Sequence, residues 1–252
     1  MDVALRALDA SANRLHGLVG PLDDAALETP AYPAEWTIAD VLSHVGSSAV
    51  ILQRRLEDAL ADQPTPDDFA PAVWDAWNAK SPRAKADDAL VADRTIIDRF
   101  AAVSDSDRSS VQLTLGPLTF DLPAFIGLRL NEHALHTWDV AVALDPKATV
   151  PADAAALVVD NLELIARYTG KPTGSVRTIV VRTTHPSRSF VINLDAEAVS
   201  LANDESARDP DVELPAEAFT RLVYGRLDPE HTPTVTGDAE ALDELRRVYP
   251  GP

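Results

Sequence analysis

Hydrophobic residues recur at helical spacing through the first two thirds of the chain. Leu5, Leu8, Ala12, Leu15 and Val19 predict an amphipathic helix over residues 3–19. Thr37, followed three residues later by Asp40, is typical of a capping box and predicts a second helix that runs to about residue 61. Further helices are expected over 84–103, over 122–144 with Asp121 as N-cap, and from Pro151 to near Tyr168. The segment between the helices 84–103 and 122–144 is expected to be a loop with a short strand at 111–115.

The pattern changes after the segment 169–175, TGKPTGS, which has the composition of a linker. Alternating and β-branched residues beyond it predict strands at 176–182, 190–194, 199–201 and 233–236. Helices are expected at 215–224, ended by Gly225, and at 238–248. The fold class is therefore α plus α/β: a helical bundle over residues 1–170, then a small α/β domain over 175–252.

Composition excludes several classes of function. Of 252 residues, 40 are acidic and 22 are basic, a formal net charge of −18. Such a chain is a poor binder of nucleic-acid phosphates and is repelled by anionic membranes. No apolar run is long enough to span a membrane, and the N-terminus lacks the pattern of a signal peptide, so we expect a cytoplasmic protein. The absence of cysteine excludes disulfides, thiolate metal ligands and a cysteine nucleophile.

Candidate chemistry is concentrated in the predicted helix 122–144. At 100° per residue, Glu132, His136 and Asp139 fall within about 60° on the face that also carries Phe125 and Leu128. Burying such polar groups without partners costs several kcal/mol, and a divalent metal ion is one partner that satisfies them. Glu and His at i and i+4 present two ligands to one point. His133 points about 100° away from Glu132 and is a weaker candidate.

A third ligand is available on the predicted helix 38–61. His44 lies at the rim of its apolar stripe, where a side chain can face a cavity between helices. Two histidines and one glutamate from two helices leave an open coordination position, which is usual for a catalytic zinc-type site. The competing interpretation is an ordinary i,i+4 contact between Glu132 and His136, with His44 as a half-buried histidine.

The two segments together resemble a known family. Trp-Thr-x-x-Asp-Val-x-x-His at 36–44 is similar to a motif of the DinB-like fold, and Arg-x-x-Glu-x-x-x-His-x-x-Asp at 129–139 is similar to its later metal-binding helix. Their separation, with a small α/β domain after the helices, resembles the mycothiol-dependent maleylpyruvate isomerase family. The resemblance implies a DinB-like, up-down four-helix bundle followed by a domain similar to sterol carrier proteins. It also implies a divalent metal, with zinc expected, held by His44, Glu132 and His136, and mycothiol as the thiol cofactor.

Other residues carry weaker signals. Arg226 follows the helix-ending Gly225, and the resemblance implies that it pairs with a substrate carboxylate; the simpler role is that of a cation near a helix C-terminus. Arg129 is expected to form an ion pair or to support a ligand, and Asp139 to orient a ligand histidine. No phosphate-binding loop, GxSxG or HExxH motif is present, which disfavours nucleotide-binding and serine-hydrolase functions.

The expected function is metal-assisted activation of the mycothiol thiolate for addition to an electrophile, as a cis/trans isomerase or as an S-transferase. The sequence does not separate these two outcomes, and it does not identify the substrate or distinguish a monomer from a homodimer. The acidic chain favours a neutral electrophile over a dicarboxylate, because it repels anions at long range. The alternative is a non-catalytic protein that binds a small hydrophobic molecule.

Overall fold

The computed structural model describes residues 2–33, 35–204 and 208–251. Contacts divide the chain into two compact units, Met1–Ala148 and Thr149–Pro252. The predicted boundary near residue 170 separates domains that are expected to fold independently. A division by contacts does not address independent folding, so this boundary stays a prediction.

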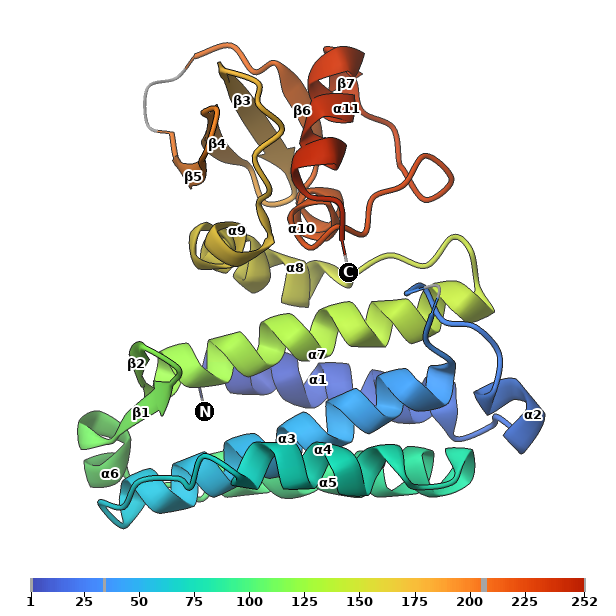
Figure 1. Ribbon diagram of the computed structural model, residues 1–252, viewed down its shortest axis with the longest axis vertical. Coiled ribbons are helices and arrows are strands. Elements are labelled where there is room, and N and C mark those ends of the chain that lie inside the picture. The colour runs from blue at the N-terminus through green and yellow to red at the C-terminus, as the bar shows by residue number, and fades with distance from the viewer. Residues whose placement is uncertain (1, 34, 205–207, 252) are drawn as a thin grey trace. The chain divides into compact units, whose positions relative to one another are not determined.

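Helices dominate the first unit (Figure 1). Four of them are long: α1 (Val3–Val19), α3 (Ile38–Leu60), α5 (Pro82–Ala101) and α7 (Leu122–Leu144). The shorter elements are α2 (Asp24–Leu27), α4 (Phe69–Asn78), α6 (Asp105–Ser110) and the antiparallel strands β1 (Gln112–Leu115) and β2 (Leu118–Asp121).

Local sequence explains where the long helices begin. The hydroxyl of Thr37 accepts a hydrogen bond from the Asp40 amide while the Asp40 carboxylate accepts one from the Thr37 amide, so the predicted capping box is confirmed. Asp121 caps α7 by accepting from the amide of Ala124, as expected. Ser81 caps α5, which begins at Pro82 rather than near residue 84, because proline suits the first helical turn.

The long helices pack side by side around a shared apolar core (Figure 1). Helix α3 packs against α5 and α7, and α1 packs against α5 and α7. Helix α7 is buried on most of its circumference, including the polar residues Arg129, His133 and Asp139. No helix within the described ranges is both long and apolar enough to cross a membrane.

The sequence missed several short elements of the first unit. Helices α4 and α6 were not predicted, and the segment 104–121 contains a complete hairpin rather than one strand in a loop. Gly116, with a φ of 57°, occupies the turn of that hairpin, where a left-handed backbone is needed.

The second unit combines short helices with a mixed sheet. Its helices are α8 (Ala152–Val158), the 3₁₀ helix η1 (Val159–Asn161), α9 (Leu162–Thr169), α10 (Ala216–Val223) and α11 (Ala239–Val248). Its strands are β3 (Arg177–Thr184), β4 (Arg188–Leu194), β5 (Val199–Asn203), β6 (Val212–Pro215) and β7 (Thr236–Gly237), in the spatial order β5-β4-β3-β6-β7. Strands β3 and β6 are parallel, and the other neighbours are antiparallel.

Helix α10 packs against this sheet. The rings of Phe190 on β4 and Phe219 on α10 lie 4.9 Å apart, and both side chains are buried. Ile179 and Val181 of β3 are fully buried, as expected for residues that alternate on one strand. The prediction of a helical N-terminal part followed by a C-terminal part with helices and a sheet is therefore confirmed.

Three sequence-based predictions for the second unit require correction. The helix expected from Pro151 to Tyr168 is interrupted by η1, which separates α8 from α9. Strand β6 was missed, because an alternation of only four residues is a weak signal and its partner in the parallel pairing, β3, is distant in sequence. The strand expected at 233–236 is shorter and later, and comprises only Thr236 and Gly237.

Candidate metal site

Helices α3 and α7 bring together the three residues that the sequence singled out as metal ligands. His44 lies in the second turn of α3, and Glu132 and His136 lie one turn apart on α7. Glu132 Oε2 is 3.9 Å from His44 Nε2 and 3.7 Å from His136 Nε2. One ligand atom from each residue lies within 4.8 Å of the other two.

The cluster is open to solvent on one side. The side chains of His44 and Glu132 are 34% and 45% exposed, whereas that of His136 is 9% exposed. A small molecule can therefore approach the cluster from the side of His44 and Glu132, while His136 is held within the protein.

The pKa shifts of His44 and Glu132 favour the protonation states in which these side chains bind a metal ion. Burial lowers the pKa of His44, and the nearby His136 and Arg129 act in the same direction, although Glu132 opposes them. Burial alone raises the pKa of the Glu132 carboxyl, but the two imidazoles outweigh it and hold that pKa well below its usual range. Near neutral pH the cluster thus contains a neutral His44 and a carboxylate, the forms that bind metal ions.

Two neighbours fix the orientation of the histidines. The buried Asp139 carboxylate lies 2.8 Å from His136 Nδ1, so the Nδ1–H group donates a hydrogen bond to Asp139 and Nε2 keeps its electron pair, which faces Glu132. The ring of Trp36 stacks on His136 at a centroid distance of 6.1 Å and lies 5.5 Å from the ring of His44. Trp36, the first residue of the 36–44 motif, therefore packs against both histidines of the site.

The donor set fits a divalent transition metal such as zinc. Two imidazole nitrogens and one carboxylate oxygen are ordinary zinc ligands, with bonds of about 2.0–2.2 Å. Ligand atoms around a tetrahedral ion of that size lie roughly 3.4 Å apart, only slightly closer than the 3.7 and 3.9 Å of the two carboxylate–imidazole pairs. Side-chain adjustments of less than about 1 Å bring the three atoms to one ion.

His133, which the sequence ranked below the other candidates, lies outside the cluster. It is fully buried, with Nδ1 2.8 Å from the Ser11 hydroxyl and Nε2 2.8 Å from the Asp93 carboxylate. This Ser–His–Asp series has the residue types of a catalytic triad but uses the opposite imidazole nitrogens, and Ser11 is only 5% exposed. The sequence missed Asp93, although an acidic residue in register with Ala89, Ile97 and Phe100 signals a buried carboxylate.

Arg226 lies in the second unit, directly after Gly225, whose φ is 68°. Its guanidinium is buried and donates a hydrogen bond from Nη1 to the carbonyl of Tyr224 at 2.9 Å. The predicted role of Arg226 in binding a substrate carboxylate stays a prediction.

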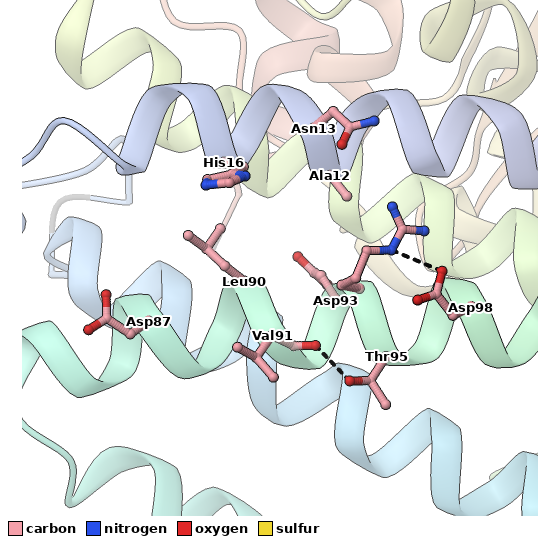
Figure 2. A pocket seen from close by; sticks show the side chains of 10 residues that line it. Ala12, Asn13, His16, Asp87, Leu90, Val91, Asp93, Thr95 and Asp98 are labelled. Atoms are coloured by element: carbon pink, nitrogen blue, oxygen red, sulfur yellow. Dashed lines mark hydrogen bonds and ion pairs between the residues drawn. The ribbon is translucent and has the colours of Figure 1, made fainter.

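Two cavities in the first unit lie away from the cluster. One, of about 520 Å³, lies between α1 and α5 and is lined by residues that include His16, Asp87 and Arg94 (Figure 2). Arg94 in its wall pairs with Asp98 and Asp9. The other, of about 590 Å³, lies beside Arg55 and Thr114. Neither is lined by His44, Glu132 or His136, so the solvent-open cluster remains the stronger candidate for chemistry.

The fold and the cluster define a two-part protein with a candidate metal site in its helical unit. The chain belongs to the mycothiol maleylpyruvate isomerase family: the family model described as the mycothiol maleylpyruvate isomerase N-terminal domain matches residues 8–141, and the MDMPI C-terminal domain matches residues 149–244. The family expected from the sequence motifs is thereby confirmed.

Two solved structures have a fold similar to that of this chain. The chain is similar to the crystal structure of the mycothiol-dependent maleylpyruvate isomerase, with 15% sequence identity, a TM-score of 0.67, and coverage of 92% of this chain and 91% of the other. A histidine-to-alanine mutant of that isomerase is similar to the same extent, with 14% identity. A comparison with curated protein sequences finds no match.

Proposed function

We propose that this protein is a metal-dependent enzyme that uses mycothiol to attack an electrophilic small molecule. The observation that carries the proposal is the convergence of His44, Glu132 and His136 from two helices at a solvent-open point, in a chain of this family. The non-catalytic alternative gives no reason for such a cluster beside an oriented imidazole.

The proposed fold assignment is a DinB-like four-helix bundle, formed by α1, α3, α5 and α7, followed by a domain similar to sterol carrier proteins. It is supported by the packing of the long helices and by helix α10 against the mixed sheet. The cytoplasmic location stays a prediction.

In the proposed mechanism the three residues hold a divalent ion, for which zinc is our choice. A bound ion of this kind stabilises a thiolate, which is the nucleophilic form of a thiol. Asp139 holds His136 in the tautomer whose Nε2 faces the site. The indole of Trp36 lies nearly parallel to the His136 imidazole and packs beside it.

Two reactions remain within this proposal. In the isomerase reaction, a cis double bond conjugated with a carbonyl accepts the thiolate, rotates as a single bond and re-forms as trans when the thiolate leaves. In the S-transferase reaction, the new carbon–sulfur bond is retained. Arg226 is the cation that we assign to a carboxylate of an acidic substrate.

Metal analysis of protein purified without an affinity tag tests the site. We expect about one zinc ion per chain, and loss of it in the His44→Ala and His136→Ala variants. His16→Ala is a matched control, because His16 is exposed on α1, lies outside the cluster and lines the α1–α5 cavity. A native protein that neither contains nor binds zinc contradicts the proposal.

An activity panel separates the two reactions. The protein is incubated with mycothiol and either maleylpyruvate, neutral cis-enones or alkylating electrophiles, and free thiol and product are followed together. Product formed at constant thiol identifies an isomerase, and stoichiometric thiol consumption identifies an S-transferase. If neither occurs faster than with the His44→Ala variant, the proposed activity is wrong.

A further inference from the structure

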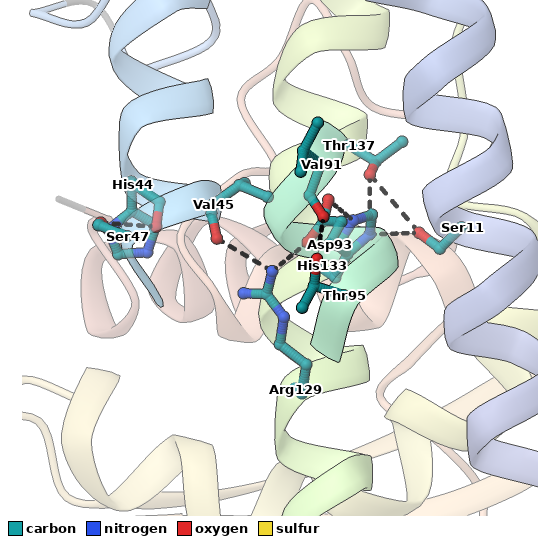
Figure 3. A network of polar contacts seen from close by, with 10 residues as sticks. All are labelled: Ser11, His44, Val45, Ser47, Val91, Asp93, Thr95, Arg129, His133 and Thr137. Carbon is teal, nitrogen blue, oxygen red and sulfur yellow. Dashed lines mark hydrogen bonds and ion pairs between the residues drawn. The ribbon is translucent and has the colours of Figure 1, made fainter. Parts of the chain in front are cut away.

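A buried polar network lies next to the candidate metal site in the first unit (Figure 3). Arg129 of α7 donates from Nη2 to Asp93 Oδ1 of α5 at 2.5 Å, and the second oxygen of Asp93 lies 2.8 Å from His133 Nε2. The series ends at Ser11 of α1. Arg129 and Asp93 are 1% and 2% exposed, so this ion pair is withdrawn from solvent.

The same guanidinium also reaches helix α3. Arg129 Nη2 donates to the carbonyl oxygen of Val45 at 3.0 Å (Figure 3). Val45 directly follows His44, and Arg129 lies one helical turn before Glu132. One side chain of α7 therefore connects α5 and the α3 backbone at the position that carries the third candidate ligand.

Arg129 links α3 with α7, although each of these two helices packs more extensively against another helix than against the other. Helix α3 packs mainly against α5, and α7 packs mainly against α1. The three ligands, however, come from α3 and α7, so the site requires that the spacing of these two helices be fixed. Apolar side chains can slide past one another at small cost, whereas one guanidinium nitrogen whose two N–H groups are held by a carboxylate and a carbonyl defines one arrangement.

The network is a poor explanation for stability alone. Desolvation of a buried ion pair offsets most of its Coulomb attraction, and apolar replacements of similar volume are often as stable. A role in fixing geometry explains better why the charges lie at this point between the helices.

We propose that Arg129 is a positioning residue for the metal site: it holds the α3 backbone at Val45 against α7, so that His44 reaches the ion bound by Glu132 and His136. The inference rests on the proposed metal site. It assigns to Arg129 no contact with substrate.

The test is zinc affinity, measured by competition with a chromophoric chelator, with the cobalt absorption spectrum as a measure of ligand geometry. The main variant is Arg129→Met/Asp93→Asn, which removes both charges together and leaves neither unpaired. We expect it to unfold cooperatively and to bind zinc about tenfold more weakly than the parent, the lower end of the effect of removing groups that orient metal ligands. Its cobalt spectrum is expected to differ from that of the parent, because His44 is no longer held in the same position.

Ser11→Ala is the matched control, because it removes a hydrogen bond at the far end of the same network without touching α3. We expect its zinc affinity to stay within twofold of the parent. Arg129→Lys is the second test variant: it keeps a cation beside Asp93, but its ammonium lies one bond nearer the main chain than Nη2. We expect it to lose the reach to the Val45 carbonyl, so its zinc affinity should also fall severalfold.

The outcomes separate this inference from the proposed function. If the parent binds zinc no better than a His44→Ala/His136→Ala variant, the metal site is wrong and the positioning role falls with it. If the parent binds zinc and the folded Arg129 variants bind it equally tightly with the parent's cobalt spectrum, only the positioning role is overturned. Should the double variant not fold, the affinity of Arg129→Lys decides in the same way.

Discussion

Asp139 shows how a single buried carboxylate determines which nitrogen of a histidine faces the site. Its oxygen lies 2.8 Å from His136 Nδ1, and an ionised carboxylate can only accept a hydrogen bond there. The electron pair of the imidazole is then on Nε2, 3.7 Å from Glu132 Oε2. The tautomer, and with it the capacity of His136 to bind a metal ion, depends on the charge of Asp139.

We therefore expect Asp139→Asn to weaken zinc binding about tenfold with little change in fold. The asparagine amide can donate to Nδ1, which moves the imidazole proton to Nε2 and blocks the metal-binding position. Zinc competition and the thermal midpoint of unfolding measure the two effects. Asp145→Asn, the same substitution at the exposed C-terminal end of α7, should leave both unchanged; equal affinities in the two variants would contradict the assignment.

At the level of secondary structure elements, the crossing of α3 with α4 and α5 depends on Gly46. A Cβ atom at this position would lie 2.2 Å from Trp77 Cη2 and 2.9 Å from the Ala89 backbone. The absence of a side chain allows α3 to approach its neighbours closely, two residues beyond His44. The close approach explains a mid-helix glycine that helix propensity disfavours.

Two glycine substitutions should consequently have opposite effects. Gly46→Ala is expected to destabilise the protein by about 1–3 kcal/mol through overpacking, despite the better helix propensity of alanine. Gly17→Ala in α1, where nothing lies within 4 Å of the added atom, should instead stabilise it by up to about 1 kcal/mol. Urea denaturation measures both, and stabilisation by Gly46→Ala would show that the helices can separate at no cost.

Glu244 ties helix α11 to the segment before β3. Its carboxylate accepts a hydrogen bond from the Thr173 hydroxyl at 2.5 Å and pairs with Arg247. The bond from Thr173, and then that from Arg247, lowers the pKa of Glu244 to about 2. Because the folded-state pKa is below the unfolded one, the ionised carboxylate stabilises the fold above about pH 4.5, and this contribution disappears as the pH falls toward 2.

Glu244→Gln should accordingly cost about 1 kcal/mol at pH 7, where the carboxylate is fully ionised. The difference from the parent should shrink below about pH 4.5, because the unfolded chain then binds a proton at Glu244 while the folded protein keeps the carboxylate ionised. Urea unfolding at pH 7 and pH 3.5 checks the direction. A difference that grows toward acid would mean that the carboxylate is not favoured in the folded state.

The sequence predicted those elements whose signals are local. The helices 3–19 and 122–144 were placed correctly, because apolar spacing marks the first and Asp121 caps the start of the second. The three ligand candidates were found because the i,i+4 pair and a rim histidine are visible in single helices. Asp93 and the Val45 carbonyl could not be assigned to the site, because only the packing of α3, α5 and α7 brings them to Arg129. Strand β6 escaped for the same reason, since its partner β3 is distant in sequence.

The net charge of the whole molecule bears on the choice of substrate. At −18, the chain repels anions over distances set by the screening length, which shortens from about 30 Å at 0.01 M salt to about 10 Å at 0.1 M. A dicarboxylate must overcome this field before it reaches the proposed site, whereas a neutral electrophile does not sense it. The acidic composition thus acts on the rate of encounter, even though it has no part in the fold.

Salt dependence of kcat/KM therefore distinguishes the two substrate classes. Raising the ionic strength from about 0.01 to 0.1 M should increase kcat/KM for maleylpyruvate roughly twofold or more, because screening weakens the long-range repulsion. A neutral cis-enone assayed with the same preparation is the control, and its kcat/KM should stay constant. If the value for the dianion falls instead, the local field of the bound ion and Arg226 dominates its approach, and the preference for a neutral substrate inferred from the composition is wrong.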